Sequence, residues 1–121
     1  MKKKILLIED HSDLREATAE LLQFYGYEVL LADNGLLGLT IAASQFPALI
    51  LSDLRMPGMS GYELFERLQE DMRTAAIPVI LTSANFNRNT VAYKEYPGVA
   101  TCLAKPFDED GLLNAIDIAL K

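Results

Sequence analysis

Residues 48–61 of the chain read ALILSDLRMPGMSG and place a strand, a loop and a helix start in immediate succession. Ala48–Leu51 is a short apolar run, which is typical of a buried strand. Ser60, with Glu63 three residues later, fits a capping box and predicts a helix that continues to about Glu70. Asp53 stands at the end of this strand, before the loop, so this unit is expected to present a carboxylate at its strand end.

Four further apolar runs predict four further strands. They are short, they are bounded by turn residues, and they cover Ile5–Ile8, Val29–Ala32, Val79–Leu81 and Val99–Leu103. The runs at 5–8, 48–51 and 79–81 show almost no polar alternation. That pattern is expected where helices cover both faces of a parallel sheet.

Helical segments with local start signals lie between these strands. The expected starts are Asp13 with Glu16 (a second capping box), Asn34-Gly35 with a helix to about Ser44, Ser60, and the acidic turn Asp108–Asp110. A fourth helix over Phe86–Pro97 is expected to be short and less stable, because it contains poor helix formers and ends at Pro97-Gly98.

Five strand–helix units in a chain of 121 residues predict one α/β domain over residues 1–121, with an open, doubly wound five-stranded parallel sheet and five helices. In such sheets the ligand site lies outside the carboxyl ends of the strands, where the strand order reverses. The residues at those ends are therefore the candidates for function.

Composition narrows the class of protein. The net charge is −6 and the pI is about 4.7, which argues against direct binding to nucleic acid, because that affinity comes mainly from Lys and Arg. Cys102 is the single cysteine, so no internal disulfide is expected. The apolar run Ile5–Ile8 is too short for a secretory signal or a membrane span, and a cytoplasmic protein is expected.

Acidic, hydroxyl and basic side chains meet at the predicted site edge. The strand ends carry Glu9-Asp10, Asp53, Thr82-Ser83 and Lys105-Pro106. Three carboxylates close together repel one another, and a hard divalent cation such as Mg²⁺ would relieve that repulsion. A metal, a carboxylate nucleophile, an ammonium and a hydroxyl together favour a site that forms an aspartyl phosphate.

Four motifs also carry a family resemblance. They are IED at 8–10, DLRMPGMSG at 53–61, PVILTSA at 78–84 and KPF at 105–107. In this order and at these distances they resemble the response-regulator receiver (CheY-like) family, and the resemblance spans the whole chain. It implies the flavodoxin-like strand order 2-1-3-4-5.

The resemblance also implies a role for each position. Asp53 is the expected phosphoacceptor; Glu9, Asp10, Asp53 and the backbone carbonyl of Arg55 are the expected metal site; Ser83, Ala84 and Lys105 are expected to bind the phosphoryl group; Lys105-Pro106 is expected to be a cis peptide. Ser83 is preferred over Thr82 as the switch hydroxyl, because neighbouring strand residues point to opposite faces and the family places a small residue, here Ala84, next.

Two further positions near the predicted site are Cys102, which departs from the family pattern, and His11. Cys102 occupies the position where the family usually has a switching aromatic residue, and a small buried filler is the expected role. The usual coupling between switch hydroxyl and aromatic ring is thereby in doubt. His11 follows the acidic pair and is expected to be an exposed loop residue, although it could touch the water shell of the metal.

These observations favour a receiver that accepts a phosphoryl group from a histidine kinase or phosphotransfer protein and catalyses only its own phosphorylation and dephosphorylation. An aspartate-nucleophile phosphatase is the alternative, but such enzymes need a second Asp where Arg55 stands. A flavodoxin-like nucleotide binder is disfavoured because Glu9-Asp10 would repel phosphate. The resemblance implies an output partner or domain at the face from the fourth to the fifth helix, a possible phosphorylation-dependent homodimer, and no membrane partner.

Overall fold

The computed structural model describes residues 2–84 and 98–121. In chain order its elements are β1 (Lys4–Ile8), α1 (Ser12–Phe24), β2 (Glu28–Ala32), α2 (Gly35–Gln45), β3 (Leu49–Asp53), α3 (Gly61–Glu70), β4 (Val79–Ser83), β5 (Thr101–Ala104) and α5 (Glu109–Ala119). The predicted fourth helix, Phe86–Pro97, lies outside the described residues.

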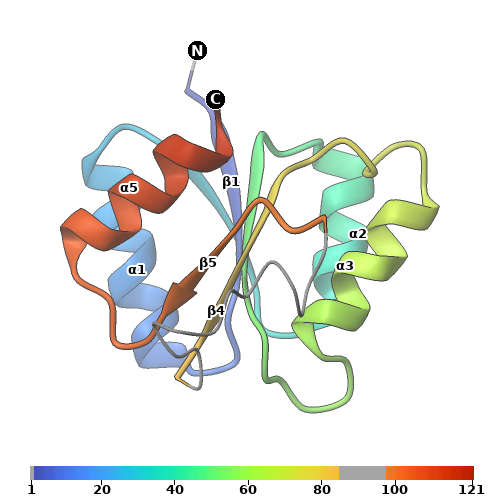
Figure 1. Cartoon of the computed structure of the whole chain (residues 1–121), viewed down its shortest axis with the longest axis horizontal. Helices are drawn as coiled ribbons and strands as arrows, with labels where there is room; N and C mark the ends of the chain where they lie inside the picture. The colour runs from blue at the N-terminus through green and yellow to red at the C-terminus, as the bar shows by residue number, and fades with distance from the viewer. Residues whose placement is uncertain (1, 85–97) are drawn as a thin grey trace.

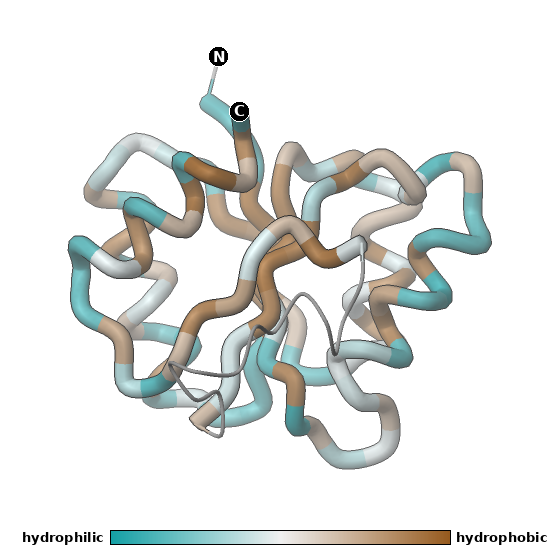
Figure 2. Tube along the Cα trace, in the orientation of Figure 1, coloured by the Kyte–Doolittle hydropathy of each residue, from teal (hydrophilic) through white to brown (hydrophobic). Residues whose placement is uncertain are grey.

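All five strands form one parallel sheet in the order β2-β1-β3-β4-β5, which confirms the predicted fold class and strand order. In Figure 1, α1 and α5 lie on one side of this sheet, and α2 and α3 lie on the other. The chain therefore buries both faces of its central strands. Figure 2 shows the same arrangement as hydrophobic colouring along the central strands and hydrophilic colouring on the outer parts of the helices.

Alternate residues of the strands fill two separate cores. In β1, Ile5 and Leu7 pack with α1 and α5, whereas Leu6 and Ile8 pack with α2 and α3. All four side chains are buried, as expected for a parallel strand that is covered on both faces. Packing on both faces fixes the strand ends, and with them the position of the site.

Three of the predicted helix starts have a side-chain cap. Asn34, Ser60 and Asp108 each accept a hydrogen bond from the backbone N–H three residues later, at 2.9, 3.1 and 2.7 Å. Such caps typically stabilise a helix by about 1 kcal/mol. Asn34 and Ser60 confirm the helix starts that were read from the sequence.

The predicted capping box at Asp13 and Glu16 is wrong. α1 begins one residue before Asp13, and its N-cap is His11, which makes no side-chain cap bond. The reason is that the loop before the helix is organised by Glu9, whose side chain accepts the His11 N–H at 3.2 Å. Asp13 instead lies in the first turn, where the helix dipole stabilises its negative charge.

Two strands run further than their apolar residues indicated. The apolar runs end at Leu51 and Leu81, whereas β3 extends to Asp53 and β4 extends to Ser83, the polar residues that were expected at these strand ends. The ladder between them continues through the pair Asp53 and Thr82. These last strand residues are polar yet buried, which brings functional side chains into the sheet itself.

The turn from β3 into α3 has little room. Gly61 stands at the first position of α3, and a Cβ there would lie 2.5 Å from the carbonyl oxygen of Asp53. The Gly61 N–H donates to Leu54 O at 2.8 Å. The close packing of this turn holds the backbone of Asp53 in place.

No helix within residues 2–84 and 98–121 is both long enough and apolar enough to cross a lipid bilayer.

Candidate functional site

The site forms where the carboxyl ends of β1, β3, β4 and β5 meet. The strand register places Ile8 beside Ser52, Asp53 beside Thr82, and Ser83 beside Ala104. The residues that follow these ladders, Glu9-Asp10 after β1 and Lys105 after β5, therefore reach the same edge as Asp53. This is the edge at which α/β sheets of this kind bind ligands.

Glu9 is a buried carboxylate with a partner on each oxygen. Its side chain is 5% exposed, and its Oε1 accepts a hydrogen bond from Lys105 Nζ at 2.7 Å. Its Oε2 accepts the backbone N–H of His11 at 3.2 Å. The Glu9 carbonyl also accepts a hydrogen bond from Arg15 Nη1 at 2.7 Å. These contacts fix both the side chain and the backbone of Glu9 at the end of β1.

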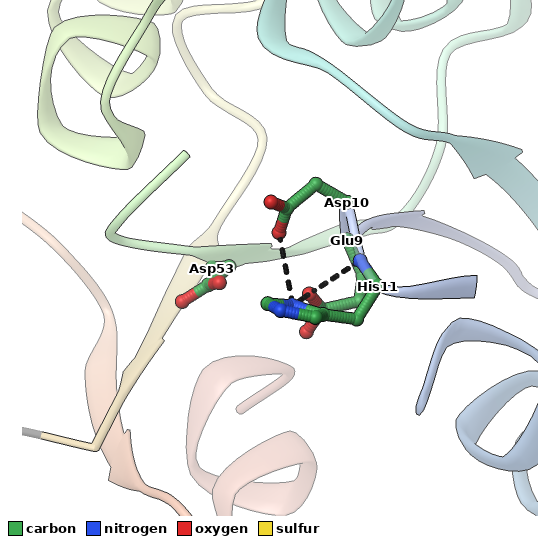
Figure 3. Close-up of side chains that lie close together, drawn as sticks. All are labelled: Glu9, Asp10, His11 and Asp53. Atoms are coloured by element: carbon green, nitrogen blue, oxygen red, sulfur yellow. Dashed lines mark hydrogen bonds and ion pairs between the residues drawn. The ribbon is translucent and has the colours of Figure 1, made fainter. Parts of the chain in front are cut away.

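Asp10 and His11 complete the acidic side of the site. Asp10 Oδ1 is buried but accepts no hydrogen bond from the described residues. His11 Nδ1 lies 3.3 Å from that oxygen and 3.3 Å from Glu9 Oε2. Ligand atoms of Glu9, Asp10, His11 and Asp53 all lie within 4.8 Å of one another, and Figure 3 shows Asp53 on the neighbouring strand beside the other three.

Asp53 reaches the cluster from the end of β3. Its side chain is 7% exposed, and its Oδ2 lies 3.3 Å from Lys105 Nζ, which is farther than the 2.7 Å between that ammonium and Glu9. The Arg55 N–H contacts Asp53 Oδ1 at the long distance of 3.4 Å. Lys105 thus pairs mainly with Glu9, and Asp53 is the less compensated of the two carboxylates.

The pKa values of the two carboxyl groups shift in opposite directions. Burial disfavours ionisation of Glu9, but the hydrogen bonds from Lys105 and His11 outweigh it, so the pKa of Glu9 is lowered. Burial raises the pKa of Asp53; Lys105 opposes this change, and the negative charge of Glu9 adds to it. Burial also acts against the charged form of Lys105, but Glu9 and Asp53 raise its pKa overall.

This donor set fits a hard divalent cation. Three carboxylates supply oxygen ligands, which Mg²⁺ prefers, and the Asp10 oxygen that accepts no hydrogen bond from the described residues has free capacity to bind a cation. A divalent charge would also offset the negative charge that Lys105 leaves uncompensated. Glu9, Asp10 and Asp53 are therefore the described side chains that could hold Mg²⁺.

A cleft of about 600 Å³ opens directly over Asp53 and Lys105. Ser83 and Ala84 line it, together with Arg55 and the start of α1. Thr82 is buried and is not among the lining residues, as the alternation of side chains along β4 requires. The adjacent hydroxyls of β4 thus differ in their access to the acidic cluster.

The structure also describes the remaining predicted site residues. Arg55 is exposed and is among the residues that line the cleft, and the Lys105–Pro106 peptide bond is cis. Cys102 is half-buried in β5, where it pairs with Leu81 and packs against the core on the α2 and α3 side. It lies on the opposite side of the sheet from α1 and α5.

Two residues of the site contact the acidic pair Glu9-Asp10 in a way that the sequence analysis did not predict. Arg15 supports the Glu9 carbonyl, but an arginine in an amphipathic helix carries no local signal of such a bond. His11 was expected to be exposed, and its side chain is 74% exposed, yet its ring nitrogen also lies against both carboxylates. The position of His11 next to Glu9-Asp10 was the one available signal.

Comparison with known proteins gives a consistent result. The family profile of the response regulator receiver domain matches residues 5–117. Protein PilH of Pseudomonas aeruginosa is 32% identical over 117 residues, which cover 97% of each chain. Some relatives are much longer, and the chain spans 8% of the length of one of them, a histidine kinase of Formosa agariphila.

Solved structures agree in fold. The chemotaxis protein CheY4 of Vibrio cholerae superposes with a TM-score of 0.89 at 26% identity, covering 99% of this chain and 100% of that one. The receiver domain of the sensor histidine kinase PA1611 of Pseudomonas aeruginosa, which has a magnesium ion coordinated in its active site cleft, superposes with a TM-score of 0.87 at 26% identity, covering 99% and 98% of the two chains.

Replacement of Asp53 by Asn is expected to stabilise the metal-free protein at neutral pH. Because the folded-state pKa of Asp53 is raised above 3.8, the stability that this group contributes is complete below that pH and declines as the pH rises through the folded-state pKa. Asn resembles the protonated form at every pH. Its advantage should be on the order of 1 kcal/mol at neutral pH and should shrink toward about pH 4.

Urea denaturation in the presence of EDTA would measure this difference. Asp117→Asn is the matched control, since Asp117 is an exposed acid on α5. An Asp53→Asn variant that is no more stable than wild type at neutral pH would show that Lys105 compensates Asp53 fully.

Proposed function

The chain belongs to the response regulator receiver domain family, and from this we propose that it is a two-component receiver that accepts a phosphoryl group on Asp53. The observation that carries the proposal is the position of Asp53. Its carboxylate is buried at the base of an open cleft, with the Lys105 ammonium 3.3 Å away and two further carboxylates beside it. The cleft offers a phosphoryl donor a path to this carboxylate.

In the proposed reaction a carboxylate oxygen of Asp53 attacks the phosphorus atom in line with the leaving group. The new bond is an acyl phosphate, and the bond that breaks is the P–N bond of a phosphohistidine or the P–O bond of a small acyl phosphate. The leaving group departs with the electron pair. Such transfers depend on positioning and charge neutralisation more than on covalent chemistry by other protein groups.

Glu9, Asp10 and Asp53 would hold Mg²⁺ with the backbone carbonyl of Arg55, and the ion when bound would supply positive charge at the reacting oxygens. Lys105 has the protonated form and the position to pair with a phosphoryl oxygen. Phosphorylation would then replace the Asp53 carboxylate with a phosphoryl group of greater negative charge, which would compete with Glu9 for this ammonium. Competition between Glu9 and the phosphoryl group for Lys105 would link phosphorylation of Asp53 to a change in conformation at this edge of the sheet.

Ser83 and Ala84 are proposed to bind the phosphoryl group from the β4 side of the cleft. Both line it, and a hydroxyl that donates to a phosphoryl oxygen makes a charge-assisted hydrogen bond. In the family, an aromatic residue usually moves together with the switch hydroxyl, and Cys102 stands in its place here. We therefore propose that movement of Ser83 toward the phosphoryl group is transmitted to partners through the segment after β4 and the α5 face.

The proposed donor is a sensor histidine kinase or a phosphotransfer protein in the cytoplasm, and the proposed recipient of the signal is an output protein or domain. A net charge of −6 supports a protein partner over direct contact with nucleic acid. Phosphorylation-dependent homodimerisation is a further possible output of the same switch.

The alternative function, an aspartate-nucleophile phosphatase, has less support. That chemistry needs an acid or base two residues after the nucleophile, and the side chain there is the exposed guanidinium of Arg55. Arginine stays protonated and cannot exchange a proton with a leaving group at neutral pH. A receiver that phosphorylates only itself needs no such group.

Acetyl phosphate with Mg²⁺ is expected to label the protein on Asp53 alone. Mass spectrometry of the intact protein and of its peptides would locate the phosphoryl group. Label should be lost in Asp53→Asn and on chelation of the metal, because the nucleophile and the charge neutralisation are both needed. Asp117→Asn, which removes an exposed carboxylate, should label as wild type does.

Two outcomes would contradict this assignment. Labelling that survives in Asp53→Asn would place the nucleophile elsewhere. Multiple turnovers of p-nitrophenyl phosphate by the wild-type protein, abolished in Asp53→Asn, would instead support the phosphatase.

Ser83→Ala is expected to weaken binding of the phosphoryl mimic beryllofluoride, and Thr82→Ala is expected to leave it nearly unchanged. Loss of one hydrogen bond to a charged group costs about 1.5–3 kcal/mol, which corresponds to roughly tenfold or more in affinity. Isothermal titration calorimetry in excess Mg²⁺ would compare the variants. A larger loss in Thr82→Ala than in Ser83→Ala would reverse the assignment of the switch hydroxyl.

A further inference from the structure

His11 brings a nitrogen donor into a site that otherwise offers carboxylate oxygens. Its Nδ1 lies 3.3 Å from Glu9 Oε2 and 3.3 Å from Asp10 Oδ1. The side chain is 74% exposed, so packing does not hold the ring in this position. The hydrogen bond from the His11 N–H to Glu9 Oε2 at 3.2 Å fixes the backbone of this N-cap residue beside the acidic pair, and the ring nitrogen itself lies within hydrogen-bond range of Glu9 Oε2. Figure 3 shows the ring beside the Glu9 carboxylate, with its contact to Asp10 as a dashed line.

The separations between these donor atoms suit ligands of one ion. Two donors at about 2.1 Å from a metal are roughly 3.0 Å apart in octahedral geometry and roughly 3.4 Å apart in tetrahedral geometry. The two distances of 3.3 Å from His11 Nδ1 fall within that range. All four candidate ligand atoms lie within 4.8 Å, so small side-chain rotations would close the set.

The remaining contacts do not use the full acceptor capacity of these donor atoms. Lys105 occupies Glu9 Oε1, whereas Oε2 faces His11. Asp10 Oδ1 accepts no hydrogen bond from any residue in the described part of the chain. Glu9 Oε2, Asp10 Oδ1 and His11 Nδ1 therefore form a triangle of donor atoms, and the Lys105 ammonium pairs with other oxygens, Glu9 Oε1 and Asp53 Oδ2. One nitrogen and two carboxylate oxygens make up that triangle.

Nitrogen changes which metal such a site prefers. Imidazole suits borderline divalent ions such as Zn²⁺ and Co²⁺, whereas Mg²⁺ prefers oxygen and keeps several of its waters. We propose that His11 is a direct ligand that gives this site a selective preference for borderline transition metals over Mg²⁺. This inference rests on the proposed function in one respect, that Glu9, Asp10 and Asp53 form the metal site of the receiver.

A hydrogen-bonding role for His11 would leave the same distances. In that case the ring would only bridge Glu9 and Asp10 as a donor and would be displaced when an ion binds. His11→Asn separates the two roles, because its amide can still donate to both carboxylates but supplies no imidazole nitrogen. His11→Ala removes both functions.

Calorimetric titration with Zn²⁺ and with Mg²⁺ would test the proposal. The measured quantity is the ratio of the two affinities in wild type, His11→Ala and His11→Asn. The protein should carry no histidine tag, and a Cys102→Ser background removes the chain's one thiol. The ratio of Zn²⁺ to Mg²⁺ affinity is expected to fall roughly tenfold or more in both variants, as loss of metal-site groups typically does.

A spectroscopic readout accompanies the titration. Because the chain has one histidine, nitrogen resonances from isotope-labelled histidine report on His11 alone. Zn²⁺ should shift the Nδ1 resonance to the range of a metal-bound nitrogen, and Mg²⁺ should not.

The outcomes separate this inference from the proposed function. An unchanged affinity ratio in His11→Ala, or full retention of it in His11→Asn, would overturn the ligand role while Mg²⁺ binding still supports the receiver. Failure of the wild-type protein to bind either ion would contradict the metal site itself, and with it both proposals.

Discussion

The distribution of charge at one edge of the sheet governs this site. Glu9 and Asp53 are both buried there, Asp10 lies beside them, and within the described residues Lys105 is the one ammonium in contact with them. That ammonium lies 2.7 Å from Glu9 and 3.3 Å from Asp53. Glu9 is thereby stabilised as an anion, whereas burial raises the pKa of Asp53. The site has an excess of negative charge that a divalent cation would relieve.

The rest of the fold keeps these groups together. Cores on both faces of the sheet fix the ends of β1 and β3, and the close approach of Gly61 to the Asp53 carbonyl holds the turn that follows. Arg15 ties the start of α1 to the Glu9 carbonyl. The carboxylates cannot separate to reduce their repulsion without disturbing this packing, so the relief must come from protons or from bound cations.

Sequence reasoning succeeded where a single physical signal decides the outcome. Apolar runs such as Ile5–Ile8 and the caps Asn34 and Ser60 depend on nearby residues, and the structure confirms these elements. It failed at Asp13, because a long-range cluster around Glu9 organises the start of α1. The apolar run by itself stops at Leu51, and the expected place of Asp53 at the end of the strand is confirmed because the polar positions after Leu51 are buried too.

The residues that form the site were easier to predict than the contacts between them. The cluster of Glu9, Asp10 and Asp53 was expected from strand ends, and the structure brings their ligand atoms together with that of His11. Which carboxylate Lys105 prefers depends on differences of less than an ångström that no sequence pattern carries. The contact of His11 likewise depends on the exact turn of backbone between β1 and α1.

The dependence of thermal stability on Mg²⁺ tests the central claim most directly. If the cation relieves the repulsion among the three carboxylates, the melting temperature of the wild-type protein should rise as Mg²⁺ is added. At a Mg²⁺ concentration of ten times the dissociation constant, the free energy of unfolding should be larger by about 1.4 kcal/mol. Asp10→Ala should abolish that rise, and Asp117→Asn should retain it. A wild-type melting temperature that does not respond to millimolar Mg²⁺ would contradict the account, because the buried carboxylates would then need no cation.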